Sequence, residues 1–121
     1  MSLVYVHDRL ANAMLLFTFI AGVWGLVRYA AKHPVGGNYW GVLAAGELLF
    51  FVQGALGATL FLTGARPAQS IHILYGVVAV VTLPIYYGIS HGRDDRRAVL
   101  VYGLLCLFLT GVTLRAIMTA G

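Results

Sequence analysis

Residues 40–62 read WGVLAAGELLFFVQGALGATLFL, a run in which Glu47 is the only charged side chain. A transmembrane helix needs about 20 mostly apolar residues to cross the hydrocarbon core of a bilayer. The run lacks the strict alternation of a membrane β-strand, and in lipid only a helix or a closed barrel pairs all of its backbone polar groups. This stretch therefore predicts a membrane-spanning α-helix.

Three further stretches have the same apolar character, namely Val4–Tyr29, Ile71–Ile89 and Ala98–Met118. The chain of 121 residues is 60% hydrophobic and only 10% charged, whereas soluble domains carry about 25% charged residues. This composition excludes an ordinary soluble domain, and it excludes a disordered chain, which needs low hydrophobicity and high charge. We expect an all-α integral membrane protein with one four-helix transmembrane domain over residues 1–121.

Short joints separate the four stretches, and they hold proline, glycine or charged residues that end helices. They cover residues 32–38, 63–67 and 90–97. Short connections place sequential helices side by side and antiparallel, so the sequence predicts an up-and-down bundle. Asp95 is a candidate N-cap for the fourth helix.

The basic residues indicate the orientation of the bundle in the membrane. Five of them lie at the first and third joints (Arg28, Lys32, Arg93, Arg96, Arg97), and three lie at the opposite end (Arg9, Arg66, Arg115). Because cytoplasmic loops carry an excess of Lys and Arg, we expect both termini outside, in a multi-pass protein of a bacterial inner membrane. Loop charges and lipid headgroups account for the net charge of +4. The sequence lacks the interleaved basic and aromatic surface that predicts a nucleic-acid partner.

Two histidines open odd-numbered helices: His7 near the start of the first and His72 near the start of the third. Odd-numbered helices of such a bundle run the same way, so these imidazoles are expected at the same depth. Two neutral imidazoles that face each other across a bundle are the axial ligands of a six-coordinate haem iron. Gly76, one turn after His72, leaves room for a flat macrocycle. Small residues at this spacing equally allow close helix packing, and interfacial histidines can instead bind headgroups or loops.

The second helix adds Gln53, Gly54 and Gly57. A buried glutamine needs hydrogen-bond partners, and glycines let a backbone or a cofactor approach closely. Both observations are equally consistent with plain helix packing.

These motifs resemble the haem A synthase family. The matching features are Gln53-x-x-Leu56-Gly57, a Thr63-Gly64 helix end, a short proline-containing loop and then His72. His7-Asp8-Arg9 looks like the His-Arg element of that family with one residue inserted. The resemblance covers Val4–Tyr87, one half of a protein built from two bundles. It implies a haem-binding four-helix bundle with His7 and His72 as iron ligands and Gln53 and Gly57 in the haem site.

Two departures from the family pattern bear on its activity. Val4 occupies the position of a glutamate that the family uses in oxidising a haem methyl group, and the sequence carries one bundle rather than two. We therefore expect haem binding rather than haem A synthesis, and we assign no catalytic residue. No nucleophile–base pair and no cysteine–histidine zinc spacing is present in the sequence.

Other polar residues have candidate roles in the membrane. Arg9, Arg66 and Arg115 lie at the histidine end, where guanidinium groups are suited to pair with haem propionates or to reach lipid headgroups. Glu47 is a candidate proton relay, quinone contact or link to a partner subunit. A second haem on His33 and His91 at the opposite end is not expected, because both lie in loops outside the apolar runs.

The sequence thus predicts a small membrane b-type cytochrome. One haem b is held by His7 and His72, and the chain transfers electrons within a respiratory or photosynthetic membrane complex. Its expected partners are the lipid bilayer, other membrane subunits or a second copy of the chain, with quinone as a further candidate. The alternatives are a haem-free accessory subunit of a membrane oxidoreductase and a half-size, haem A synthase-like haem-modifying enzyme.

Overall fold

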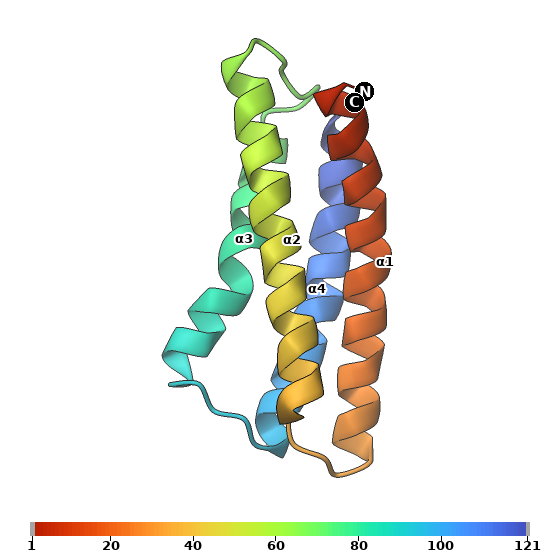
Figure 1. Ribbon diagram of the computed structural model, residues 1–121, viewed down its shortest axis with the longest axis vertical. Coiled ribbons are helices and arrows are strands. Elements are labelled where there is room, and N and C mark those ends of the chain that lie inside the picture. Colours follow the sequence, from red (N-terminus) through yellow and green to blue (C-terminus); the bar gives the residue numbers. More distant parts are fainter. Residues whose placement is uncertain (1, 121) are drawn as a thin grey trace.

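The computed structural model describes residues 2–120, which form four long helices. They are α1 (Leu3–Ala30), α2 (Gly36–Leu62), α3 (Ile71–Ile89) and α4 (Arg96–Ala120). Figure 1 shows them side by side, with the start of α1 and the end of α4 at the same end of the bundle. All four helices are long and apolar enough to cross a membrane. The predicted all-α, four-helix architecture is confirmed, and the described part of the chain contains no strand.

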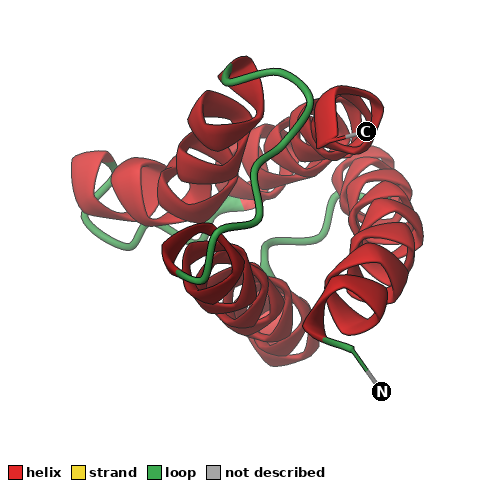
Figure 2. Cartoon of the chain, turned by 90° about the horizontal axis from the view of Figure 1, so that it is seen from above, coloured by secondary structure: helices red, strands yellow, loops and turns green. Residues whose placement is uncertain are grey.

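The helices form a closed ring. Each packs against its neighbours in the sequence, and α4 completes the ring by packing against α1 (Figure 2). The contact between α1 and α4 is the most extensive of the four. As a result α1 and α3, which carry the two predicted haem ligands, occupy diagonally opposite positions in the ring.

Glycines allow the close approach of α1 and α4. A Cβ atom built on Gly103 of α4 would lie 3.2 Å from backbone atoms of Gly22, Gly25 and Leu26 in α1. Further along the contact between α1 and α4, the hydroxyl groups of Thr18 and Thr110 share a hydrogen bond of 3.0 Å. Small residues and interhelical hydrogen bonds of this kind drive helix association in lipid, where the hydrophobic effect contributes little.

The second helix begins about one turn earlier than the sequence predicts, at Gly36 instead of Trp40. Glycine and asparagine are poor helix formers, so the sequence predicts a joint over residues 36–38. Tertiary contacts outweigh this preference. Tyr39 is fully buried and its hydroxyl donates a 2.9 Å hydrogen bond to the carbonyl of Ala21. Val35 is also buried, and its N–H donates to the carbonyl of Asp94.

The predicted cap of the last helix is present. The Oδ1 atom of Asp95 accepts a 2.9 Å hydrogen bond from the backbone N–H of Ala98. Asp95 therefore satisfies one of the free N–H groups at the start of α4, which begins at Arg96.

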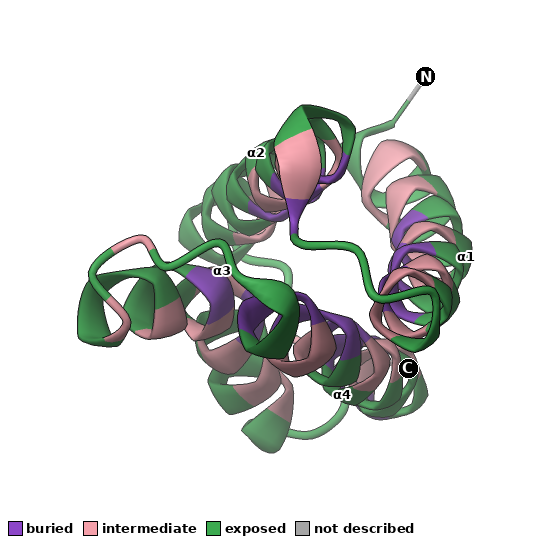
Figure 3. Cartoon of the chain, turned by 90° about the horizontal axis from the view of Figure 1, so that it is seen from below, coloured by how far each residue is buried: buried purple, intermediate pink, exposed green. Residues whose placement is uncertain are grey.

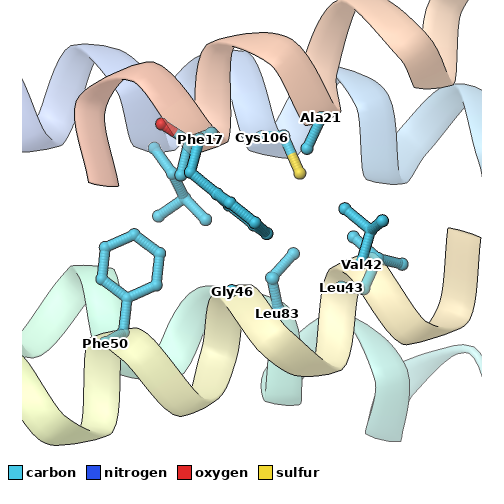
Figure 4. Close-up of a pocket in the computed structure, with 10 residues that line it drawn as sticks. Phe17, Ala21, Val42, Leu43, Gly46, Phe50, Leu83 and Cys106 are labelled. Carbon is cyan, nitrogen blue, oxygen red and sulfur yellow. The ribbon is translucent and has the colours of Figure 1, made fainter. Parts of the chain in front are cut away.

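Side chains fill the interior of the bundle, while its outer surface is apolar. Buried positions face inwards in Figure 3, and many large apolar residues such as Leu48, Leu62 and Ile89 are exposed on the outside. Midway along the bundle a void of about 10 Å³ remains among apolar side chains, including Phe17, Leu43 and Cys106 (Figure 4). An apolar void of this size stays dry. The core positions the helices, and the exposed apolar surface is the kind that lipid covers.

Candidate functional site

The structure brings His7 and His72 together. His7 lies near the start of α1 and His72 near the start of α3, and both side chains are half-buried at the end of the bundle that holds the termini. Their ring centroids are 6.3 Å apart and the ring planes meet at 74°. The prediction that these histidines lie at the same depth is confirmed.

His72 is held in one orientation by α4. Its Nδ1 atom lies 2.7 Å from the backbone carbonyl oxygen of Ala116. Because a carbonyl only accepts hydrogen bonds, Nδ1 carries the proton, and the lone pair is left on Nε2. Metal-binding histidines almost always donate their other N–H in this way. His72 therefore has the tautomer of a metal ligand that binds through Nε2.

The loop before α3 fixes the position of His72 relative to α4. The backbone N–H groups of Ala68 and Gln69 donate 3.0 Å hydrogen bonds to the carbonyls of Ala120 and Thr119. The last carbonyls of a helix have no partner within the helix, so this loop supplies partners for two of them. The same contacts hold the start of α3 against the end of α4, beside Ala116.

His7 is held from the other side by α2. The side-chain amide of Gln53 donates a 2.8 Å hydrogen bond to the backbone carbonyl of His7. A Cβ atom built on Gly57 would lie 3.3 Å from Cε1 of His7, closer than most real contacts of this type. Both residues singled out from the Gln-x-x-Leu-Gly motif therefore contact the same histidine. Within residues 2–120, His7 Nδ1 and Gln53 Oε1 are buried without a hydrogen-bond partner.

Three other predicted site residues, Gly76, Arg9 and Arg115, lie at the same end of the bundle. Within the described part of the chain, none of them forms a hydrogen bond with the side chain of either histidine. Gly76 is exposed, and a Cβ atom there would meet no other atom within 4 Å. Arg9 extends over the ring of Tyr5, at 5.6 Å from its centroid. Arg115 is exposed on α4 and lines a groove with Tyr75. The pairing of these arginines with haem propionates stays a prediction.

Arg66 has local partners. Its guanidinium group stacks on the ring of Phe61, 3.8 Å from the centroid, and donates to the carbonyl of the same residue. These contacts hold Arg66 against the end of α2.

The opposite end of the bundle contains an aromatic cluster that sequence reasoning missed. Trp40 contacts Tyr87 and Tyr102 edge-to-face, at 5.8 and 5.4 Å between centroids, and Tyr86 contacts Tyr102 at 4.8 Å. Single aromatic residues near the ends of membrane helices commonly mark the membrane interface, so their types alone do not predict a cluster. Their meeting depends on how three helices are rotated about their axes, which composition does not reveal.

The other polar candidates are separate from the histidine pair. Both carboxylate oxygens of Glu47 are buried, with no hydrogen-bond partner in the described part of the chain. His33 and His91 are exposed in the turns after α1 and α3. His91 has a φ of 54°, so it occupies the left-handed position that commonly ends a helix.

Between residues 2 and 120 no group of three or more His, Cys, Asp or Glu side chains is arranged to hold a metal ion. A haem iron with two histidine ligands does not need such a group, because the macrocycle supplies the other four nitrogens. Comparisons of the chain with protein-family models, curated proteins and solved structures find no match.

Proposed function

We propose that this chain is a small membrane b-type cytochrome in which His7 and His72 hold one haem b. The observation that carries the proposal is the 6.3 Å separation of the two imidazole centroids. A metal ion held between the rings would be within reach of one nitrogen of each, because metal–imidazole bonds are about 2 Å long.

The surroundings of the pair fit this role. The hydrogen bond from His72 to Ala116 leaves the Nε2 lone pair available. Gly57 has no side chain, which leaves room for the His7 ring beside α2. Gly76, one turn after His72 on α3, has open space next to it. His7 differs from His72 in its hydrogen bonding, because its Nδ1 is buried with no hydrogen-bond partner among the described residues.

A bound haem supplies one-electron redox chemistry that the protein side chains lack. The chain itself provides two imidazole nitrogens and fixes the tautomer of His72. We infer that it transfers electrons within a respiratory or photosynthetic membrane complex, to or from a partner subunit or a second copy. The counts of lysine and arginine at the two ends favour a haem on the outer side of a bacterial inner membrane.

A visible spectrum of the detergent-purified protein, produced with haem supplied, tests the proposal. The dithionite-reduced protein should show the sharp α-band of a low-spin, bis-histidine haem. His7→Ala and His72→Ala should each lose this band or give a high-spin spectrum. His33→Ala and His91→Ala are matched controls and should keep it. A wild-type protein without an α-band would overturn the proposal, and loss of the band in either control would overturn the ligand assignment.

A haem-free accessory subunit is the second candidate, and one observation favours it. Gly37 and Gly41 lie four residues apart on the exposed side of α2, and a Cβ atom at either position would meet no other atom within 4 Å. Small residues at this spacing suit close packing against a helix of another subunit. A half-size haem-modifying enzyme has less support, because Val4 supplies no carboxylate. The spectrum separates the accessory subunit, which has no α-band, from the cytochrome.

A further inference from the structure

A groove of about 380 Å³ follows the outer side of α4, near the end of the bundle that carries the histidines. It is lined by Tyr75 of α3 and by Leu107, Phe108, Gly111, Val112 and Arg115 of α4. The groove is shallow and mostly open to the outside. Gly111 forms a notch in its floor, because a Cβ atom there would meet no other atom within 4 Å.

Arg115 gives this apolar groove a positive charge at one end. The single ion pair of residues 2–120 joins Arg93 to Asp95, so no acidic side chain neutralises Arg115. Arg115 lies five residues before the end of α4, which is about 7.5 Å along the helix axis. A charge at this depth in a membrane helix is costly unless it pairs or reaches the interface. The long side chain can extend to the level of the lipid phosphates.

We propose that this groove binds an anionic phospholipid, with the phosphate at Arg115 and one acyl chain along the Phe108–Gly111 surface. Both parts of a phospholipid, its phosphate group and its acyl chain, match the groove. An unpaired guanidinium group binds phosphate oxygens in bidentate geometry. The apolar wall takes the hydrocarbon chain. Basic pockets on transmembrane helices bind lipid headgroups through the same chemistry.

The lining argues against a quinol in the same place. Oxidation of a quinol releases protons to an acceptor, and none of the six lining residues is Asp, Glu or His. The guanidinium group of Arg115 donates hydrogen bonds and accepts none. The groove is therefore suited to an anion. It also opens on the outer side of α4, where a lipid has direct access.

Native mass spectrometry of the purified protein in mixed micelles of phosphatidylglycerol and phosphatidylcholine tests this site. The wild-type protein should retain phosphatidylglycerol in preference to phosphatidylcholine. Arg115→Gln should reduce this preference about fivefold, the equivalent of one charge near an anionic lipid. Arg115→Lys keeps the charge and should keep most of the preference. Gly111→Leu fills the notch and should lower lipid retention with the charge intact.

Arg66→Gln is the matched control, because Arg66 lies at the same end but is bonded to Phe61 at the end of α2. It should leave the preference unchanged. An unaltered preference in Arg115→Gln, or an equal loss in Arg66→Gln, would overturn the proposal. Displacement of the lipid by a quinone with a tighter apparent affinity would also overturn it. The readout is a bound mass, which distinguishes bound lipid from bound haem, the other ligand predicted to contact Arg115.

Discussion

The side-chain amide of Gln53 in α2 donates a 2.8 Å hydrogen bond to the backbone carbonyl oxygen of His7 in α1. In an α-helix this carbonyl also accepts from the N–H four residues later, so Gln53 uses its second lone pair. The bond joins two helices at the level of the histidine pair. It fixes the position of α2 relative to the residue that we assign as an iron ligand.

Gln53→Glu should make the stability of the protein depend on pH. An ionised carboxylate has no proton to donate and would face the His7 carbonyl oxygen, so we expect a loss of about 1–3 kcal/mol at pH 8. A protonated carboxyl group can donate in place of the amide, so the loss should shrink as the pH falls towards 5. Unfolding in detergent at several pH values measures this. Gln69→Glu, at an exposed position, should show no such dependence, and a pH-independent Gln53→Glu protein would contradict the donor role.

Gly57→Ala should lower the haem content per protein. Its Cβ atom would lie 3.3 Å from Cε1 of His7, so the imidazole must shift by a few tenths of an ångström from its present place. Gly54→Ala is the matched control one turn earlier, where the new Cβ would lie at an ordinary 3.5 Å from Val80. The ratio of haem absorbance to protein measures the effect. Equal haem content in the two variants would show that the His7 ring is not positioned by Gly57.

Gly103→Ala should destabilise the bundle by about 1–3 kcal/mol, the usual effect of excess volume in a packed contact. The added methyl group would lie 3.2 Å from backbone atoms of α1, and backbone cannot move aside as a flexible side chain can. Gly41→Ala, whose Cβ meets nothing within 4 Å, should be neutral or slightly stabilising. Thermal unfolding in detergent compares the two. If both variants unfold at the same temperature, the stability of the α1–α4 contact does not depend on Gly103.

His91→Gly should stabilise the protein by about 1 kcal/mol. His91 has a φ of 54°, and a residue with a Cβ atom pays about 1–2 kcal/mol for this left-handed conformation while glycine does not. The melting temperature should rise and the haem spectrum should stay unchanged. His33→Gly, where φ is not positive, should give no gain. A lost α-band in His91→Gly would instead place a haem at this end of the bundle.

The sequence predicts the helices well because length and hydropathy alone define a membrane span. Three of the four starts lie within two residues of their predicted positions, and the cap at Asp95 is where its side chain and spacing place it. The shared depth of His7 and His72 follows from counting helices, because odd-numbered spans run in the same direction. The start of α2 was predicted wrongly, since buried Tyr39 stabilises a first turn whose own residues disfavour a helix.

The rotation of each helix about its axis could not be predicted. A soluble helix marks its inner face by an apolar stripe, but a helix in lipid is apolar on every side. The sequence therefore does not reveal that Gly25 and Gly103 meet, or that Tyr86 and Tyr102 make an edge-to-face contact. It also does not reveal that Gln53 contacts the backbone of His7 rather than a side chain.

The helix α1 begins and α4 ends at the same end of the bundle (Figure 1). Two copies of the gene fused head to tail would therefore give a protein whose halves keep one orientation, with no extra membrane crossing between them. Each half would carry its histidine pair to the same membrane surface. If each half bound one haem, as we propose for the single chain, the two haems would lie side by side in the plane of the membrane and not one above the other across the bilayer.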